Sequence, residues 1–323
     1  MSNLMSNLMS NIWSGKHLVH IDQLTKEHLD VFLERVKDFE AGKINSDLKS
    51  KIIASCFFEP STRTRLSFEA AAHRVGANVI GFSDVKSTSS GQKGESLMDA
   101  MKVISGYADL IVMRHPNSGS ARLASEYSDV PVINAGDGSN QHPTQTLLDL
   151  YTIAKSQNGK LDSLNILIMG DLKYSRTVHS LVQALKFYNP RFYFVSPKAL
   201  SLPKSMLDWL RDNGVRFSLH EDKDEVLPYA DIAYVTRLQQ ERLGVALDAD
   251  DLSIMQQDYF NQCCINIDDL KKVKSNLRIL HPLPRLNELP VELDDTPYAY
   301  YFTQAKLGVP VRAALLSLIL GGK

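Results

Sequence analysis

Short apolar runs of strand length recur along the chain, separated by stretches whose apolar residues follow helical spacing. The first half predicts helices that begin after Thr25 and cover 68–75 and 97–106, with strands at 52–58, 79–82, 110–113 and 130–133. The second half predicts helices at 178–187 and 204–212, with strands at 164–169, 192–195, 215–219, 232–235 and 277–280. Such alternation indicates parallel sheets that are covered by helices on both faces.

A predicted helix over 143–156 separates the two series, and the turn residues 157–159 end it. We expect two α/β domains, each a doubly wound parallel sheet, over residues 1–143 and 144–303. A last apolar helix within 304–323 is expected to pack back on the first domain. A chain of 323 residues is long enough for two such cores. In open α/β sheets ligands bind beyond the carboxyl ends of the strands, so motifs that follow strands carry the most functional weight.

A motif rich in hydroxyls and arginines, Ser61-Thr62-Arg63-Thr64-Arg65, follows the first predicted strand and opens a helix. The first turn of a helix presents unpaired N–H groups and the positive end of the helix dipole. Hydroxyl and guanidinium donors add groups that match phosphate oxygens. The alternative is an ordinary Ser/Thr helix cap with surface arginines, and the density of donors makes that interpretation the weaker one.

A glycine-rich turn is predicted at 134–138, after the fourth strand. Two further motifs offer groups for a carbonyl or an amine. His142 and Gln145 lie three residues apart on the first turn of the helix that Pro143 begins, so one face can present both. In the segment 281–285, His-Pro-Leu-Pro-Arg, two prolines stiffen a loop after a strand and leave carbonyl acceptors. Taken alone, the first motif is also compatible with a capping histidine and the second with a plain turn.

Arginines follow several other predicted strands. Arg114 ends the strand at 110–113, Arg176 follows the strand at 164–169, and Arg237 lies two residues before Gln239. A guanidinium can bind a carboxylate through two parallel hydrogen bonds, although each of these arginines alone is more typical of a solvated surface. The residues after 169 lack the G-x-G-x-x-G spacing, so a dinucleotide site is poorly supported.

The composition is that of an ordinary globular protein, with 44% hydrophobic and 23% charged residues. Basic and acidic side chains number 36 and 37, which argues against nucleic acid or an anionic membrane as a partner. Cys56, Cys263 and Cys264 are sparse and lack metal-ligand spacing, which suggests free thiols in the reducing cytoplasm. No run approaches the ~20 apolar residues that span a bilayer. The Met-Ser-Asn repeat at 1–11 lacks the pattern of a signal peptide.

Taken together, these motifs closely resemble those of the carbamoyltransferase superfamily, from about Trp13 onward. The block from Phe57 to Arg65 marks the superfamily. Segments 281–285 and 237–239 are similar to its aspartate branch. The ornithine branch typically carries a cysteine in the loop that corresponds to 281–284, where this chain has none. The resemblance implies two doubly wound α/β domains with the active site between them.

The resemblance implies a role for each motif around carbamoyl phosphate. Arg114 would assist a phosphate-binding group formed by Ser61, Thr62, Arg63 and Thr64. The carbamoyl oxygen would be polarised by Thr64, Arg114 and His142. The carbamoyl NH2 would be received by Gln145 and by the backbone carbonyls of Pro282 and Leu283.

The second substrate and a neighbouring subunit are implied in the same way. Arg176 would hold the α-carboxylate of aspartate, and Arg237 with Gln239 would hold its β-carboxylate. The polar segment 87–95 is expected to be a mobile loop. By resemblance its Ser89 and Lys93 would enter the site of the next subunit in a homotrimer, with Lys93 also reaching aspartate. Glu95 would pair with Arg63 across that interface.

The implied reaction moves the carbamoyl group of carbamoyl phosphate to the amino group of L-aspartate, in de novo pyrimidine biosynthesis. The products are N-carbamoyl-L-aspartate and phosphate, and no metal or cofactor is expected. The amine attacks the carbamoyl carbon, a tetrahedral oxyanion forms, and the departing phosphate takes the amine proton. Preplaced cationic and hydrogen-bonding groups would stabilise the oxyanion, and holding both substrates together would make the reaction effectively unimolecular.

Regulation is left open by the resemblance. Allosteric members typically have acidic residues in the loop after Arg242, and Gly244 and Leu247 occupy two of those positions here. Their expected partners Lys173 and Tyr174 are present. The sequence therefore does not decide whether a zinc-bearing regulatory chain binds in a dodecamer.

Three other functions compete with aspartate carbamoylation. A carbamoyltransferase for ornithine or a modified amino acid is disfavoured by Arg237 and Gln239, which suit a second carboxylate. A non-catalytic paralogue should have lost site residues, and every residue that can be placed is present. A nucleotide-binding oxidoreductase is disfavoured by the missing glycine fingerprint.

Overall fold

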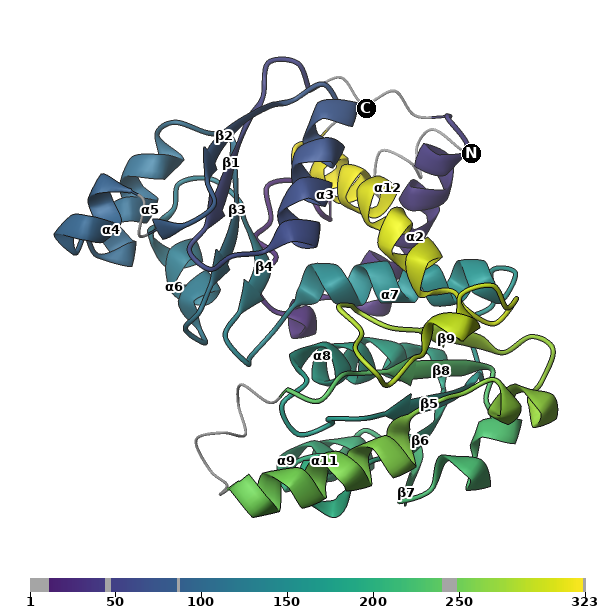
Figure 1. The fold of residues 1–323 in the computed structure, drawn as a ribbon. Coiled ribbons are helices and arrows are strands. Elements are labelled where there is room, and N and C mark those ends of the chain that lie inside the picture. Colours follow the sequence, from purple (N-terminus) through teal and green to yellow (C-terminus); the bar gives the residue numbers. More distant parts are fainter. Residues whose placement is uncertain (1–11, 44–47, 86–87, 240–248, 322–323) are drawn as a thin grey trace. The chain divides into compact units, whose positions relative to one another are not determined.

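A computed structural model describes residues 12–43, 48–85, 88–239 and 249–321, with the backbone alone at 89–90 and 249–254. The chain divides by its internal contacts into two compact units (Figure 1). The first unit extends to Tyr151 and includes the segment from Lys306 onward, and the second covers Thr152–Ala305. The division falls inside the helix that follows Pro143 rather than at its first residue.

The first unit contains a four-stranded parallel sheet in the order β2-β1-β3-β4. Its strands are β1 (Ile52–Phe57), β2 (Asn78–Phe82), β3 (Leu110–His115) and β4 (Val132–Asp137). Its helices are α2 (Lys26–Glu40), α3 (Thr62–Arg74), α4 (Ser89–Lys93), α5 (Leu97–Ser105), α6 (Ser120–Tyr127) and most of α7 (Pro143–Ser156). A 3-10 turn, Ile21–Gln23, precedes α2. All four predicted strands are present, and Thr25 caps α2 as its sequence position suggested.

Two predicted loops in this unit are regular structure instead. Residues 134–138 were expected to form a turn, but β4 continues to Asp137 because its pairing with β3 resumes at His115 after a register shift. Residues 89–93 were expected to lie in a loop, but they form the short helix α4. The hydroxyl of Thr88 accepts the N–H of Gly91 and so supports the first turn of α4.

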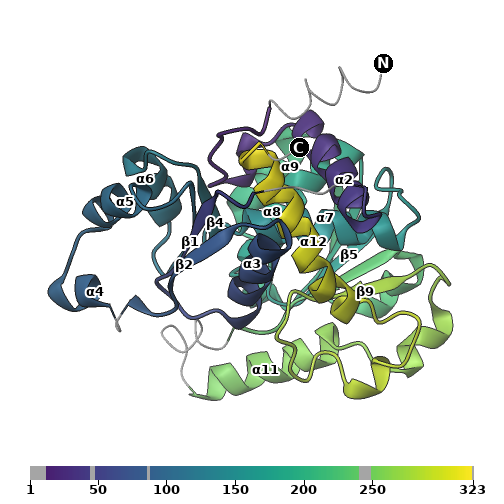
Figure 2. The same cartoon turned by 90° about the horizontal axis from the view of Figure 1, so that it is seen from above.

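Helices cover both faces of the first sheet (Figures 1 and 2). Helices α5 and α6 pack on one face, where Met101 and Ala124 join Cys56, Met113 and Val132 in an apolar cluster. Helices α2, α3 and α12 (Tyr301–Ile319) lie on the other side in both views. Strands β1, β3 and β4 are therefore largely buried, as their uninterrupted apolar runs predicted, whereas the edge strand β2 is largely exposed.

The last helix, α12, is tied to two helices of the first unit. Arg35 of α2 donates to the hydroxyl of Ser317 at 2.6 Å. The guanidinium of Arg312 lies 5.0 Å from the ring centre of Phe68 in α3. The C-terminal segment thus completes the core of the unit in which the chain begins.

The second unit contains a five-stranded parallel sheet in the order β7-β6-β5-β8-β9. Its strands are β5 (Asn165–Met169), β6 (Arg191–Val195), β7 (Arg216–His220), β8 (Ile232–Val235) and β9 (Arg278–Leu280). Its helices are α8 (Arg176–Leu185), α9 (Lys204–Asp212) and α11 (Ala249–Cys263). Short 3-10 turns lie at Lys186–Tyr188, Lys198–Leu200, Lys223–Glu225, Leu227–Tyr229, Asp268–Lys272 and Val291–Leu293. Every strand predicted for this half is present, whereas α11 was not predicted.

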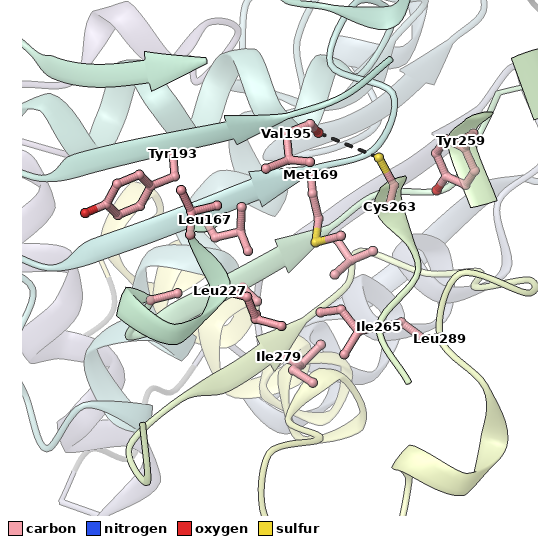
Figure 3. Close-up of a cluster of buried hydrophobic side chains, with 14 of the residues drawn as sticks. Leu167, Met169, Tyr193, Val195, Leu227, Tyr259, Cys263, Ile265, Ile279 and Leu289 are labelled. Carbon is pink, nitrogen blue, oxygen red and sulfur yellow. Dashed lines mark hydrogen bonds between the residues drawn. The ribbon is translucent and has the colours of Figure 1, made fainter. Parts of the chain in front are cut away.

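One face of the second sheet packs against α11. Met169 and Val195 lie on the same side as Tyr259 and Cys263 of that helix (Figure 3). The thiol of Cys263 donates to the carbonyl of Val195 at 3.8 Å, and burial raises the pKa of this thiol to about 12. Cys263 is therefore a packing residue rather than a reactive thiol.

Both sheets reverse their strand order beside their first strand. In the first sheet β1 lies between β2 and β3, and in the second β5 lies between β6 and β8. At such a switch point the connecting segments turn to opposite faces and leave a place for a ligand beyond the carboxyl ends. The informative loops are therefore those after β1 and β3, and those after β5 and β8.

None of the helices in the described residues has the length and apolar character of a membrane span.

Candidate active site

The phosphate motif forms the turn from β1 into α3. Ser61 is the N-cap residue of α3, but its side chain accepts no hydrogen bond from the helix. At the starts of α2 and α5, by contrast, the hydroxyls of Thr25 and Ser96 each accept a first-turn N–H. The hydroxyl of Ser61 therefore does not act as a side-chain cap. Its hydroxyl does not compete for the N–H groups of Thr62 to Thr64, which suit an anion.

Two cations lie at this turn, one on the helix that follows β1 and one on β3. Arg63 is in the first turn of α3, and Arg114 is on β3, paired in register with Phe57. Partial burial and the positive charge of Arg114 lower the pKa of the Arg63 guanidinium. The two guanidiniums are therefore close enough to repel each other, and a bound anion would relieve that repulsion.

The neighbouring charges hold Arg114 in place and exclude Arg65 from the group. Arg114 donates from Nε at 3.0 Å and from Nη2 at 2.5 Å to Glu59, which follows β1. Arg65 donates instead to Glu69, one turn further along α3, at 2.7 Å. Of the two arginines in the motif, Arg63 senses the charge of Arg114 and Arg65 is paired within its own helix.

Two buried polar side chains lie at the start of α7, His142 immediately before it and Gln145 in its first turn. His142 and Gln145 are 5% and 8% exposed. The Nε2 of Gln145 donates to the carboxylate of Asp149 at 2.8 Å. Because the amide nitrogen is engaged there, the carbonyl oxygen at the other end of the amide can accept an N–H. That is the polarity which binding a carbamoyl NH2 requires.

The loop that leads into α7 is organised by the buried carboxylate of Asp137. Its oxygens accept the N–H groups of Gln141 at 3.1 Å and of Gly119 at 2.8 Å. The amide of Asn140 donates to the same carboxylate at 3.0 Å. These bonds fix the backbone immediately before His142, so the imidazole is positioned by the loop that leads into α7.

In the second unit the carboxylate of Asp171 joins the two loops at the switch point. One oxygen accepts the N–H of Tyr174, before α8, at 3.0 Å, and the other accepts the N–H of Gln239, after β8, at 3.4 Å. Gly170 allows this close approach because a Cβ there would lie 2.3 Å from the carbonyl of Thr236, at a φ of +114°. Arg176, the first residue of α8, follows this junction directly.

The loop after β9 is held by a buried histidine. The N–H of Leu283 donates to Nδ1 of His281 at 2.8 Å, so the proton of the neutral ring is on Nε2 and faces Glu288 at 2.9 Å. Leu283 has a φ of 59° and precedes a cis peptide bond to Pro284. Among the described residues, no donor binds the carbonyls of Pro282 and Leu283. Burial, and to a smaller extent the charge of Arg237, lowers the pKa of His281, so Arg237 lies near this loop.

The predicted contributors from segment 87–95 are not brought to Arg63 within the chain. Lys93 is exposed at the end of α4, which both views place on the far side of the first unit from α3 (Figures 1 and 2). The side chain of Ser89, residues 242–248 and the repeat at 1–11 lie outside the described residues. In the part of the chain that is described, no group of His, Cys, Asp and Glu is arranged to hold a metal ion.

Three buried or half-buried carboxylates were missed by the sequence analysis. Glu59, Asp149 and Asp171 each bind a residue of the predicted site. The spacing of four residues between Gln145 and Asp149 on a predicted helix was a usable signal for one of them. The other two act across long sequence separations, which local patterns do not reveal.

Comparison with protein families agrees with this arrangement. Residues 16–155 match the carbamoyl-P binding domain of aspartate/ornithine carbamoyltransferase, and residues 162–319 match its Asp/Orn binding domain. The chain therefore belongs to the aspartate/ornithine carbamoyltransferase family. Its two parallel-sheet units correspond to the two domains of that family.

Within the family, the structures most similar to this chain include aspartate transcarbamoylases. The catalytic subunit of the M. jannaschii enzyme is 47% identical, with a TM-score of 0.85 over 94% of this chain and 97% of that chain. The Trypanosoma cruzi enzyme in complex with N-(phosphonacetyl)-L-aspartic acid is 32% identical, with a TM-score of 0.87 over 96% and 97%. The same enzyme with carbamoyl phosphate and aspartate is 33% identical, with a TM-score of 0.86 over 96% and 98%.

Proposed function

We propose that the chain transfers the carbamoyl group of carbamoyl phosphate to the amino group of L-aspartate. The single observation that carries this proposal is the pairing of Arg63 and Arg114 at the first turn of α3, beside the switch point of the first sheet. Two cations and a helix start suit a phosphate dianion. The similarity to aspartate transcarbamoylases supports aspartate as the acceptor.

Carbamoyl phosphate is assigned mainly to the first unit. Ser61, Thr62, Arg63 and Thr64 bind the phosphate at the start of α3, with Arg114 held at its side by Glu59. Thr64, Arg114 and His142 polarise the carbamoyl oxygen, with Ser89 supplied by a neighbouring subunit.

The amino end of the carbamoyl group is assigned to carbonyl oxygens. Gln145 is suited to this role because its amide nitrogen already faces Asp149. The carbonyls of Pro282 and Leu283 have the same polarity, since the loop presents no N–H at Pro282 or Pro284. These acceptors would discriminate a carbamoyl group from an acetyl group, which has no N–H to donate.

Aspartate is assigned to the loops of the second unit. Arg176 binds the α-carboxylate and Arg237, with Gln239, binds the β-carboxylate. Asp171 sets the spacing between these two loops through its bonds to Tyr174 and Gln239. Lys93 of a neighbouring subunit adds a further cation.

The chemistry follows from these groups. The amine attacks the carbamoyl carbon, and negative charge develops on the carbamoyl oxygen, where Arg114 and His142 stabilise it. The carbon–phosphate oxygen bond then breaks, and the departing phosphate accepts the amine proton. Holding both substrates together removes much of the entropic barrier.

The assembly and setting are proposed from the family resemblance. We place the chain in a homotrimer with shared active sites, in the cytoplasm, at the carbamoylation step of pyrimidine synthesis. The free cysteines agree with a reducing compartment. Binding of a zinc-bearing regulatory chain is left to experiment, since residues 242–248 lie outside the described part of the chain.

The decisive experiment is a product assay with two acceptors. Purified protein is incubated with carbamoyl phosphate and either L-aspartate or L-ornithine, and carbamoylated product and phosphate are quantified. We expect product with aspartate alone, and inhibition by N-(phosphonacetyl)-L-aspartate, which joins features of both substrates. Equal or greater turnover with ornithine would refute the acceptor assignment, and no turnover with either would refute the function.

A further inference from the structure

Buried polar and charged side chains lie between the proposed carbamoyl site and the last helix of the protein. Gln145 donates to Asp149 one turn further along α7, and Asp149 is completely buried. The negative charge of Asp149 acts on Arg312 of α12, which is 3% exposed. The guanidinium of Arg312 lies on the ring of Phe68 in α3, 5.0 Å from its centre. Arg312 therefore packs on the helix that carries the phosphate motif and senses the charge of a carboxylate on the helix that carries Gln145.

The packing around Arg312 is closely fitted. Its Nη1 donates to the carbonyl of Gly308 at 3.2 Å, one turn earlier in α12. A Cβ on Gly308 would lie 2.4 Å from that nitrogen, so glycine at this position makes room for the guanidinium. Burial lowers the pKa of Arg312 to about 10, which still leaves the side chain cationic at neutral pH. A buried cation of this kind is tolerated only with a nearby negative charge, and Asp149 supplies it.

We propose that Asp149 and Arg312 are positioning residues that fix the amide of Gln145 with its carbonyl oxygen toward the carbamoyl NH2. The inference rests on the proposed function and concerns one further step, the orientation of that amide. A side-chain amide has a donor and an acceptor end of nearly equal size, and a half-turn exchanges them. An ionised carboxylate accepts only, so Asp149 binds the NH2 end and excludes the reversed orientation. The positive charge of Arg312 lies within electrostatic reach of this carboxylate.

The test is a double-mutant cycle between Gln145 and Asp149. Asp149→Asn keeps the shape of the side chain but allows it to donate as well as accept, so both orientations of the Gln145 amide become possible. We expect Asp149→Asn to lower kcat about tenfold with the dissociation constant for aspartate unchanged. In a Gln145→Ala background the same substitution should change kcat by less than about twofold, because the group on which it acts is absent.

A second variant separates positioning from folding. Asp149→Asn leaves Arg312 without its counter-charge and is expected to lower Tm. Adding Arg312→Met removes that buried charge, so the double variant should regain Tm while kcat stays low. The matched control is Asp109→Asn, which removes the carboxylate that binds Lys51 at 2.8 Å and the N–H of Ile52 at 2.9 Å, next to the amino end of β1. That control should lower Tm and leave kcat unchanged.

The outcomes distinguish the inference from the function on which it rests. The wild-type chain in the same assay must form carbamoyl aspartate, and its failure would refute the proposed function. With an active wild type, additive effects of Asp149→Asn and Gln145→Ala on kcat would overturn the positioning role. Recovery of kcat together with Tm in the Asp149→Asn, Arg312→Met variant would overturn it too, since it would show that the pair serves folding alone.

Discussion

His281 and Glu288 form a hydrogen-bonded pair with each side chain only 1% exposed, and Nε2 lies 2.9 Å from the carboxylate. The other ring nitrogen accepts the N–H of Leu283. This arrangement requires a neutral imidazole with its proton on Nε2. The loop at 282–283, whose carbonyls are proposed to bind the carbamoyl NH2, therefore depends for its conformation on the protonation state of His281.

Stability should fall on mild acidification because of this ring. Burial lowers the pKa of His281 below its ordinary value of 6.5, with Glu288 opposing that shift and Arg285 and Arg237 adding to it. Below about pH 6.5 the unfolded chain binds a proton that the folded chain does not, so the free energy of unfolding decreases as pH falls. The contribution of one such group is at most about 1.4 kcal/mol per pH unit.

The comparison variant is His281→Asn, whose amide oxygen can still accept the N–H of Leu283. We expect a lower free energy of unfolding at pH 7.5, and a smaller further decrease between pH 7.5 and 5.5 than in the wild type. The other histidines with lowered pKa, His17, His115 and His179, are common to both chains and cancel in the difference. Chemical denaturation at both pH values measures this, and parallel pH profiles would contradict the assignment.

The phosphate motif contains two arginines that should behave differently. Arg63→Ala should lower kcat by ~100-fold or more, because it removes a cation aimed at the reacting phosphate. Arg65→Ala should stay within about threefold of wild type, since Arg65 is paired with Glu69. Steady-state kinetics with thermal unfolding as a folding control decides this. An Arg63→Ala chain within tenfold of wild type, a difference of about 1.4 kcal/mol, would mean that the phosphate binds elsewhere.

Substitutions in the proposed aspartate site should weaken the binding of aspartate but not that of carbamoyl phosphate. Arg237→Ala and Gln239→Ala should each raise the dissociation constant for aspartate by about tenfold or more, because each removes hydrogen bonds to a carboxylate of the substrate. The dissociation constant for carbamoyl phosphate should change by less than about twofold. Calorimetric titration of each substrate, or of a stable analogue, measures both. Equal losses for the two substrates would show that these residues belong to a different pocket.

Shared active sites predict complementation between inactive chains. Lys93→Ala and Arg63→Ala chains should each be nearly inactive, and mixed trimers of the two should regain activity. In such trimers one site draws an intact Arg63 from one chain and an intact Lys93 from its neighbour. Mixtures of Arg63→Ala with Arg114→Ala chains provide the control. Both residues of a given site come from the same chain, so every site in these mixtures lacks one of them. Absence of recovery in mixed trimers verified by mass spectrometry would show that each chain builds its own site.

The sequence by itself determined the strands and the ligand-binding motifs that follow them. Apolar runs such as 52–58 and 232–235 are long enough, and clearly enough bounded, for local patterns to predict buried parallel strands. The same applies to the hydroxyl and arginine motif from Ser61, because donors concentrated at a strand-to-helix turn have few other uses. Local patterns were misleading at 89–93 and 134–137. Polar and glycine-rich composition suggested loops there, but pairing with β3 and the bond from Gly91 to Thr88 stabilise regular structure.

Only the tertiary structure decided which polar groups meet. The order of strands in each sheet brings Arg63 beside Arg114, and a carboxylate at Asp171 joins loops that are 68 positions apart in the sequence. Arg312 lies in an apolar C-terminal helix, where its sequence context suggested no role at the site. Contacts between distant segments depend on the whole fold, because the free energy that holds them comes from the packing of complete sheets and helices. The polarity of the Gln145 amide is therefore a property of α7 and its surroundings rather than of the motif in which it was recognised.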